Sequence, residues 1–197
     1  MALQPAYDGI TLALGGNTVR MRPSLRAASI LERLHDGFAA LFRQIDEFHL
    51  GTIREIITIT ATDRQEASAF LSGIDRTPLQ IVADTVTAPI LALCSAFIPA
   101  SDPNAKPASN AKPMPWPEVY RELFRTATGW LLWTPEAAWN ATPTEINEAF
   151  AGHTAMLKAI HGSADDSTKP DFDPLEQVTP EQAKEGIARL KALARAS

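Results

Sequence analysis

Four histidines and the acids beside them are the side chains whose types could support catalysis or metal binding. His35 is followed by Asp36, and His49 lies two residues after Glu47. A histidine beside a carboxylate can act as a general base, and the two together can ligate a metal ion. A zinc site needs three or four converging ligands, and these histidines lack a partner four residues away or a cysteine partner. We therefore interpret them as solvated or capping residues and predict no catalytic, cofactor-binding or metal-binding residue.

The other candidates for chemistry also have structural interpretations. His153 and His161 are eight residues apart on one predicted helix. That is roughly 12 Å by the helical rise, too far to share a metal ion. Gly15-Gly16 precedes a strand rather than a helix, so it lacks the amide cradle of a phosphate loop. Cys94 is the only cysteine and lies in an apolar run, where a thiol behaves as a small buried hydrophobe. No serine lies in a Gly-x-Ser-x-Gly context, so nucleophilic catalysis is unsupported.

Composition favours a cytoplasmic protein whose partner is another protein. The 197 residues are 45% apolar with a net charge of −5, which allows one domain or two small ones. The longest apolar stretch, residues 88–98, is far below the roughly 20 residues that span a bilayer. The N-terminus lacks the basic and apolar regions of a signal peptide. Nucleic-acid binding needs clustered Lys and Arg. We predict neither membrane nor nucleic-acid binding.

All four tryptophans fall between residues 116 and 139. Tryptophan is enriched both in small aromatic cores and in interfaces, so each ring can have either role. Trp133 and Trp139 flank a capped turn, which favours the core. Trp116 and Trp130 border a linker and a helix end, where a partner could reach them. The candidate partner-binding residues are Trp116, Tyr120, Phe124, Trp130, Trp133 and Trp139.

The first part of the chain is predicted to be a β-hairpin followed by short helices. Residues 10–14 and 18–21 alternate apolar and polar side chains around a Gly-Gly-Asn turn. An isolated hairpin is marginal in water, so it must pack on the helices that come after it in the chain. Apolar periodicity and capping residues predict helices over residues 24–34, 38–48, 52–62, 63–71 and 77–97. The β-branched run 56–62 also permits a strand, and Pro89 should kink or split the last helix.

Two polar stretches divide the chain. Residues 99–113 contain Asn-Ala-Lys-Pro twice and no apolar residue larger than Ala, so they are predicted to be a flexible Pro/Ala/Asn linker. Beyond it, Pro117, Thr134-Pro135 and Thr142-Pro143 mark helix starts, and Gly129 should end the first of these helices. The predicted fold is mainly α. Its parts are an N-terminal hairpin-plus-helices module (1–98), the linker (99–113), a Trp-rich helical module (114–161), a flexible segment (162–179) and a C-terminal helix (180–197).

Both modules resemble known protein families. The run Trp133–Ile146, with two Thr-Pro turns and interleaved tryptophans, resembles short phage tail assembly chaperones found in prophages and gene transfer agents of alphaproteobacteria. Leu14-Gly15-Gly16, Val19–Ala28 and Leu31-Glu32 are similar to a second tail assembly chaperone family. The two are usually separate proteins, so their fusion departs from the pattern, as does Leu132 where a glycine is usual. The fusion could be one reading frame or the long product of a frameshift.

This resemblance implies a non-enzymatic bacteriophage tail assembly chaperone without a cofactor. Such a protein binds the long helical tape measure protein, keeps it soluble and helps recruit tail tube subunits during virion assembly. Self-association is a further option. Two alternatives remain open: a cytoplasmic helical adaptor unrelated to phage, and a metal-dependent enzyme using His35, Asp36 and His49.

Overall fold

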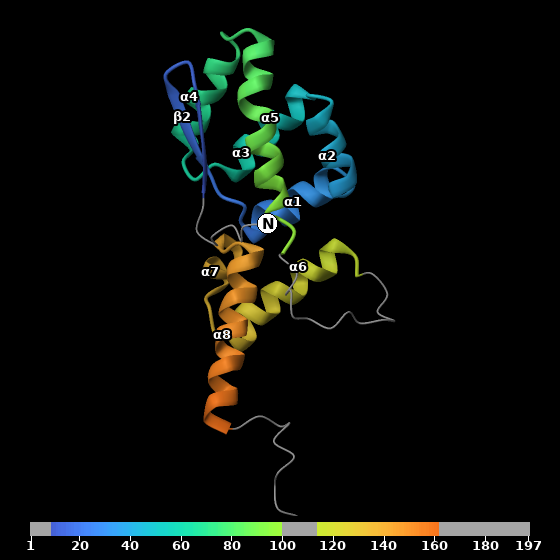
Figure 1. Ribbon diagram of the computed structural model, residues 1–197, viewed down its shortest axis with the longest axis vertical. Coiled ribbons are helices and arrows are strands. Elements are labelled where there is room, and N and C mark those ends of the chain that lie inside the picture. The colour runs from blue at the N-terminus through green and yellow to red at the C-terminus, as the bar shows by residue number, and fades with distance from the viewer. Residues whose placement is uncertain (1–8, 100–113, 162–197) are drawn as a thin grey trace, which may run out of the picture. The chain divides into compact units, whose positions relative to one another are not determined.

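The computed structural model describes residues 9–99 and 114–161. The described residues up to Met156 belong to one compact unit, and a second unit begins at Leu157. The predicted mainly α fold with an N-terminal β-hairpin is confirmed (Figure 1). Nearly all of the predicted linker lies outside the described residues, as do the flexible segment and the C-terminal helix predicted beyond residue 161. Within the described ranges, no helix has both the length and the apolar character needed to cross a bilayer.

The N-terminal hairpin has one buried face. Strands β1 (Ile10–Leu14) and β2 (Asn17–Met21) pair antiparallel. Gly15 and Gly16 connect them with φ angles of 57° and 81°, the left-handed region that a tight hairpin turn requires. Figure 1 shows the hairpin beside α4 (Arg64–Ile74). Its buried side chains, all on one face, are Leu12, Leu14, Val19 and Met21.

Capping residues begin several helices where the sequence predicts them. Ser24 accepts a hydrogen bond from the Ala27 amide at the start of α1 (Leu25–Leu34). Asp63 accepts from the amides of Gln65 and Glu66 at the start of α4. These contacts satisfy backbone donors that the first helical turn leaves unpaired. The remaining helices of this segment are α2 (Phe38–Asp46), α3 (Leu50–Thr60) and α5 (Leu79–Ser95).

The helix favoured for residues 56–62 is confirmed through Thr60, and the strand alternative is wrong. The predicted capping box at Thr52 is also wrong, because α3 begins at Leu50. Nδ1 of His49 accepts a hydrogen bond from the Thr52 amide at 3.3 Å and so caps the helix. The Thr52 side chain is buried inside the first turn instead.

Two helices continue past residues predicted to interrupt them. α4 ends at Ile74, one residue beyond Gly73. α5 contains Pro89 but is not split there. A proline inside a helix removes one hydrogen bond, and here burial on both sides of it compensates. The buried side chains of α5 are Val82, Val86, Ile90, Leu93 and Cys94.

The second segment consists of α6 (Trp116–Arg125), the π-helical turn η1 (Thr126–Trp130), α7 (Pro135–Asn140) and α8 (Pro143–His161). The starts predicted at the two Thr-Pro pairs are confirmed. Thr134 accepts a hydrogen bond from the Ala137 amide. Gly129 does not end α6 as predicted, because the helix widens into the π turn and continues to Trp130.

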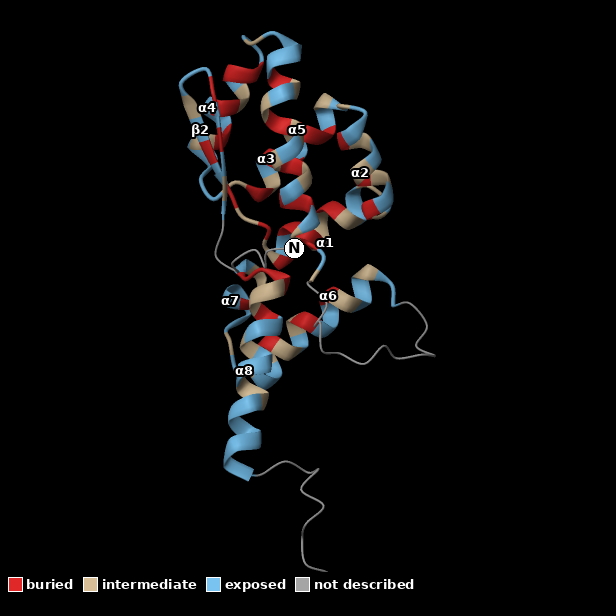
Figure 2. Ribbon diagram, viewed as in Figure 1, coloured by how far each residue is buried: buried red, intermediate tan, exposed pale blue. Residues whose placement is uncertain are grey.

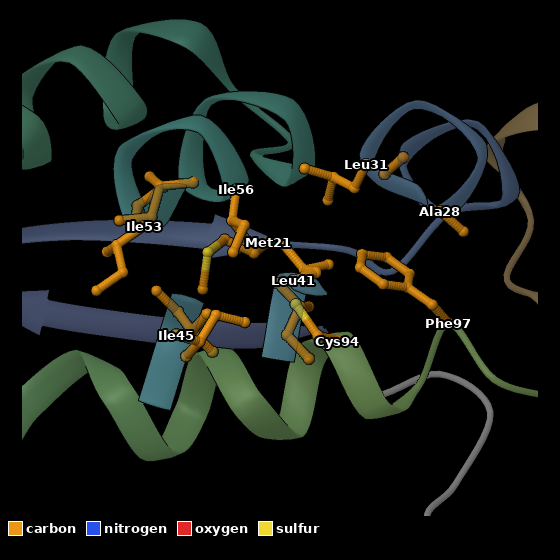
Figure 3. Packing of buried hydrophobic residues seen from close by; sticks show 14 of the residues in the cluster. Met21, Ala28, Leu31, Leu41, Ile45, Ile53, Ile56, Cys94 and Phe97 are labelled. Carbon is orange, nitrogen blue, oxygen red and sulfur yellow. The ribbon is translucent and has the colours of Figure 1, made fainter. Parts of the chain in front are cut away.

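One hydrophobic core runs through both segments of the compact unit. Figure 3 shows its centre, where Cys94 and Phe97 pack with Leu31 and Leu41. The same core continues into the second segment through Tyr120, Leu123, Ala127, Ala138, Ala141 and Ile146. The boundary that the sequence places between the two modules is therefore not a boundary between two cores.

Candidate partner-binding site

Two of the predicted partner-binding residues, Trp116 and Tyr120, lie against the first segment. The Phe38 ring meets Trp116 edge-on at 5.3 Å and Tyr120 edge-on at 6.2 Å, measured between ring centroids. The Tyr120 hydroxyl donates a hydrogen bond to the Phe97 carbonyl at 3.1 Å. Burial raises the pKa of Tyr120, and Glu32 raises it further. These rings join α6 to the first segment, and Tyr120 offers a partner no exposed surface.

Three further predicted residues are partly buried. The rings of Phe124 and Trp139 lie 4.7 Å apart, between α6 and α7. The Trp133 amide donates to the Ala127 carbonyl at 3.0 Å, which closes the turn after η1. Trp133 and Trp139 both pack against the core, in keeping with the role that the sequence favours for them.

Trp130 is the predicted partner-binding residue that is most exposed. Its side chain is 63% exposed at the end of η1. The neighbouring ring is Phe150 of α8, 36% exposed, with centroids 6.4 Å apart and planes inclined at 62°. Leu132 lies two residues after Trp130 and is 83% exposed. We call Trp130, Leu132 and Phe150 the apolar patch. Figure 2 shows that α8 changes from buried at its start to mostly exposed beyond this point.

The π turn and the loop after it determine the positions of Trp130 and Leu132. The Leu131 amide donates to the Thr126 carbonyl at 3.1 Å, the five-residue step that defines a π turn. Ala127, fully buried, fixes this turn to the core. Leu132 then adopts a φ of +56°, which costs a residue with a β-carbon roughly 1–2 kcal/mol. Such strain in a native chain often marks a functional site.

A partly buried ion pair fixes the start of α8 to the hairpin segment. Nη2 of Arg22 lies 2.5 and 2.6 Å from the two carboxylate oxygens of Glu145, and its Nε donates to the Asn140 carbonyl. Glu145 also accepts from the Thr142 amide, while its own amide donates to the Thr142 hydroxyl. This reciprocal capping box and the ion pair share one carboxylate. They border an open hollow of about 530 Å³.

The histidines considered for metal chemistry have separate structural positions. Nε2 of His35 is buried without a hydrogen bond, 3.4 Å from a carboxylate oxygen of Glu55. His49 caps α3. Among the residues that the structure describes, no three His, Cys, Asp or Glu side chains are grouped to hold a metal ion. His35, Asp36 and His49 therefore do not form a three-ligand site.

Cys94 is fully buried, as predicted from its apolar neighbours. Burial raises the pKa of its thiol to about 12, so it stays protonated at neutral pH. A protonated, inaccessible thiol is inert as a nucleophile.

Sequence reasoning missed Leu132 and Phe150 as surface residues, and Arg22 as the partner of Glu145. Phe150 had a usable signal, since it lies four residues after Ile146 and continues the apolar face of α8. The Arg22 and Glu145 positions are 123 residues apart, and no local pattern links them.

Comparisons of this chain with known proteins find no match. No protein-family model matches the chain, and neither do the curated proteins or the solved structures. The likeness to tail assembly chaperones therefore depends on the motifs within residues 14–32 and 133–146.

Proposed function

We propose that this chain is a phage tail assembly chaperone. It binds the tape measure protein, covers apolar helical segments that would otherwise aggregate, and helps recruit tail tube subunits. The observation that carries this proposal is the apolar patch, where a tryptophan and a leucine are more than half exposed on a well-packed unit. The motifs that resemble tail assembly chaperones supply the identity of the partner.

The chemistry of the patch suits protein binding. Exposed apolar surfaces that include tryptophan mark interaction sites, because burying such side chains releases water and anchors the partner. Each large apolar side chain buried on association contributes about 1.5–3 kcal/mol before the entropic costs of binding. The neighbouring rings of Trp130 and Phe150, together with the exposed Leu132, can therefore support a specific complex.

Co-expression with the tape measure protein of the same particle tests the proposal. The tape measure protein is produced alone, with the full chain, or with an unrelated acidic protein of similar size. We expect it to be insoluble alone and to co-purify with the full chain in the soluble fraction. The unrelated protein controls for general effects of acidic charge.

Equal insolubility of the tape measure protein in all three cultures would refute the proposed function. A metal-dependent activity of the purified chain, lost in His35→Ala and His49→Ala variants, would favour the enzymatic alternative instead. The full chain is used because the second segment shares its core with the first, and a shortened chain would expose Phe38 and Phe97.

A further inference from the structure

We infer that residues 180–197 of this chain dock as an amphipathic helix on the exposed apolar face at the end of α8. That face consists of Met156, Leu157 and Ile160, which are 49%, 36% and 65% exposed. We call these three residues the distal face. It lies further along α8 than Phe150 of the apolar patch. The contact is within one chain, so it does not depend on the proposed function.

The distal face continues an apolar stripe that is buried at the start of α8. Ile146 is fully buried, and Phe150, four residues later, is 36% exposed. The same side of the helix then carries Leu157 and Ile160, at further steps of seven and three residues. All residues from 155 to 161 are exposed, and Figure 2 shows this end of α8 in the exposed colour. The stripe therefore extends past the point where the described core covers it.

The segment 180–197 has apolar residues at the same spacing. They recur at steps of four, three and four residues, which is the spacing along the seam between two paired helices. These residues are Ala183, Ile187, Leu190 and Ala194. The residues of α8 at the same steps are Ile146, Phe150, His153 and Leu157. Each helix therefore has a stripe of matching period that can pack along the other.

The segment needs such a contact to be a stable helix. It has only 18 residues and contains Gly186 in its interior. Isolated helices of about this length are marginal in water, and an interior glycine weakens them further. Most of the stability of a helix in a protein comes from packing its apolar face. Ile187 and Leu190 gain that packing when they cover the distal face.

The connection between α8 and the segment is long enough for this contact. α8 ends at His161, and the 18 residues 162–179 lie between it and the segment. An extended chain of this length spans roughly 60 Å. The stripe from Phe150 to Ile160 measures about 15 Å along the helix axis, and the stripe from residue 183 to residue 194 would measure about 16 Å. The two stripes therefore match in length, and the connection permits either orientation.

The covalent connection favours this segment over a second copy of the chain. The sequence predicts residues 162–179 to be flexible, and short flexible connections give effective concentrations of roughly millimolar. A separate copy at micromolar concentration has to compete with this much higher local concentration. The occupant of the distal face is therefore the chain's own C-terminal segment.

Hydrogen exchange of the full chain, measured by mass spectrometry, tests the docking. Amides of residues 183–194 should exchange at least about ten-fold more slowly than in a free peptide of the same sequence, because docking protects helical hydrogen bonds. Leu157→Ser with Ile160→Ser should remove this protection. Leu79→Ser with Ile81→Ser changes another exposed apolar pair, 59% and 51% exposed on α5, and should leave the protection unchanged.

Variants of the segment test the same contact from the other side. Ile187→Ser with Leu190→Ser should raise the exchange rates both of the segment and of residues 157–161 of α8. Ala188→Ser with Ala192→Ser changes the opposite side of the predicted helix and should retain clearly more protection. Tryptophan fluorescence in urea should give the same midpoint for all variants, which verifies that the compact unit remains folded.

Exchange of residues 183–194 at the rates of the free peptide would overturn the inference. Protection that survives Leu157→Ser with Ile160→Ser would also overturn it, because the segment would then be ordered elsewhere. Sedimentation equilibrium identifies the occupant: a protected monomer supports docking within one chain, whereas protection that appears only with a dimer would assign the distal face to a second copy and overturn the inference. The tape measure protein is absent from these experiments, so its solubility remains a separate test of the proposed function.

Discussion

Three non-glycine residues of the described chain have left-handed backbone, and they differ in what offsets the strain. Asp36 has a short polar side chain of the kind that tolerates this region. Phe48 packs partly buried against the core. Leu132 has neither compensation, since it is apolar and exposed. Among the three it is therefore the residue whose strain neither its side chain nor burial offsets.

Replacing Leu132 with glycine should stabilise the free protein. Glycine adopts positive φ without steric cost, and little burial is lost at this position. The relief of roughly 1–2 kcal/mol, less the entropy of the more flexible unfolded chain, leaves a gain of about 0.5–1 kcal/mol. Urea unfolding measures it. Phe48→Gly is the matched control and should destabilise, because its ring contacts the core. A loss of stability in Leu132→Gly would contradict this account.

Cys94 should make stability depend on pH in the alkaline range. Burial raises its pKa from 9.0 to about 12, so above pH 9 the unfolded chain loses this proton before the folded chain does. Stability from this group is complete below pH 9 and falls as pH rises toward 12, by about 1.4 kcal/mol per pH unit. Urea unfolding of wild type and Cys94→Ala should therefore converge as pH rises. Parallel profiles would show that the thiol ionises equally easily in both states.

At the scale of elements, the hairpin segment is tied to α8 by one carboxylate. The Glu145 side chain is 11% exposed and its partner Arg22 is 36% exposed, so water screens this pair only partly. Arg20 and Glu66 form a second hairpin pair, at 66% and 29% exposure, which water screens more strongly. The two pairs make a matched comparison within one protein.

A double-mutant cycle of Arg22→Met and Glu145→Gln should give a coupling energy of about 1–2 kcal/mol in urea unfolding. Glutamine keeps an oxygen that can accept from the Thr142 amide, so the cycle reports the ion pair rather than the helix cap. The corresponding cycle for Arg20 and Glu66, which water screens more strongly, should give a clearly smaller coupling energy. Similar coupling in both cycles would mean that burial does not strengthen the first pair.

Local sequence patterns predict the start of a helix correctly where the residues of the pattern themselves form the hydrogen bond that begins the helix. Thr134 and Thr142 begin helices because their side chains bond amides three residues on, a pattern readable from sequence. His49 caps α3 equally well, but histidine is not a typical cap, so the sequence predicts the start of that helix too late. The π turn and the shared core depend on contacts between distant segments, which no local pattern contains. The apolar patch could be only half predicted, through Trp130.

At the scale of the whole compact unit, the tryptophans report on one segment and the helices report on both. All four tryptophans lie in residues 116–139, whereas helices occur in the first segment (α1 to α5) and in the second (α6 to α8). Phe38 links the two segments. Its ring contacts Trp116 and Tyr120 of the second segment and stacks on Phe97 of the first, with centroids 6.0 Å apart. We call these contacts the seam. A substitution that weakens this seam should therefore lower the stability of both segments.

Unfolding should be a single cooperative transition over both segments. Tryptophan fluorescence monitors the second segment alone, whereas far-ultraviolet circular dichroism monitors the helices of both segments, so the two urea curves should coincide if one core holds both. Phe38→Ala, which removes a ring from the seam, should destabilise by about 3–5 kcal/mol. It should move both curves together, whereas Leu79→Ser, at an exposed site far from the tryptophans in sequence, should move neither. A fluorescence transition at clearly lower urea than the circular dichroism transition would mean that the Trp-rich segment detaches first, and that the shared core adds little to its stability.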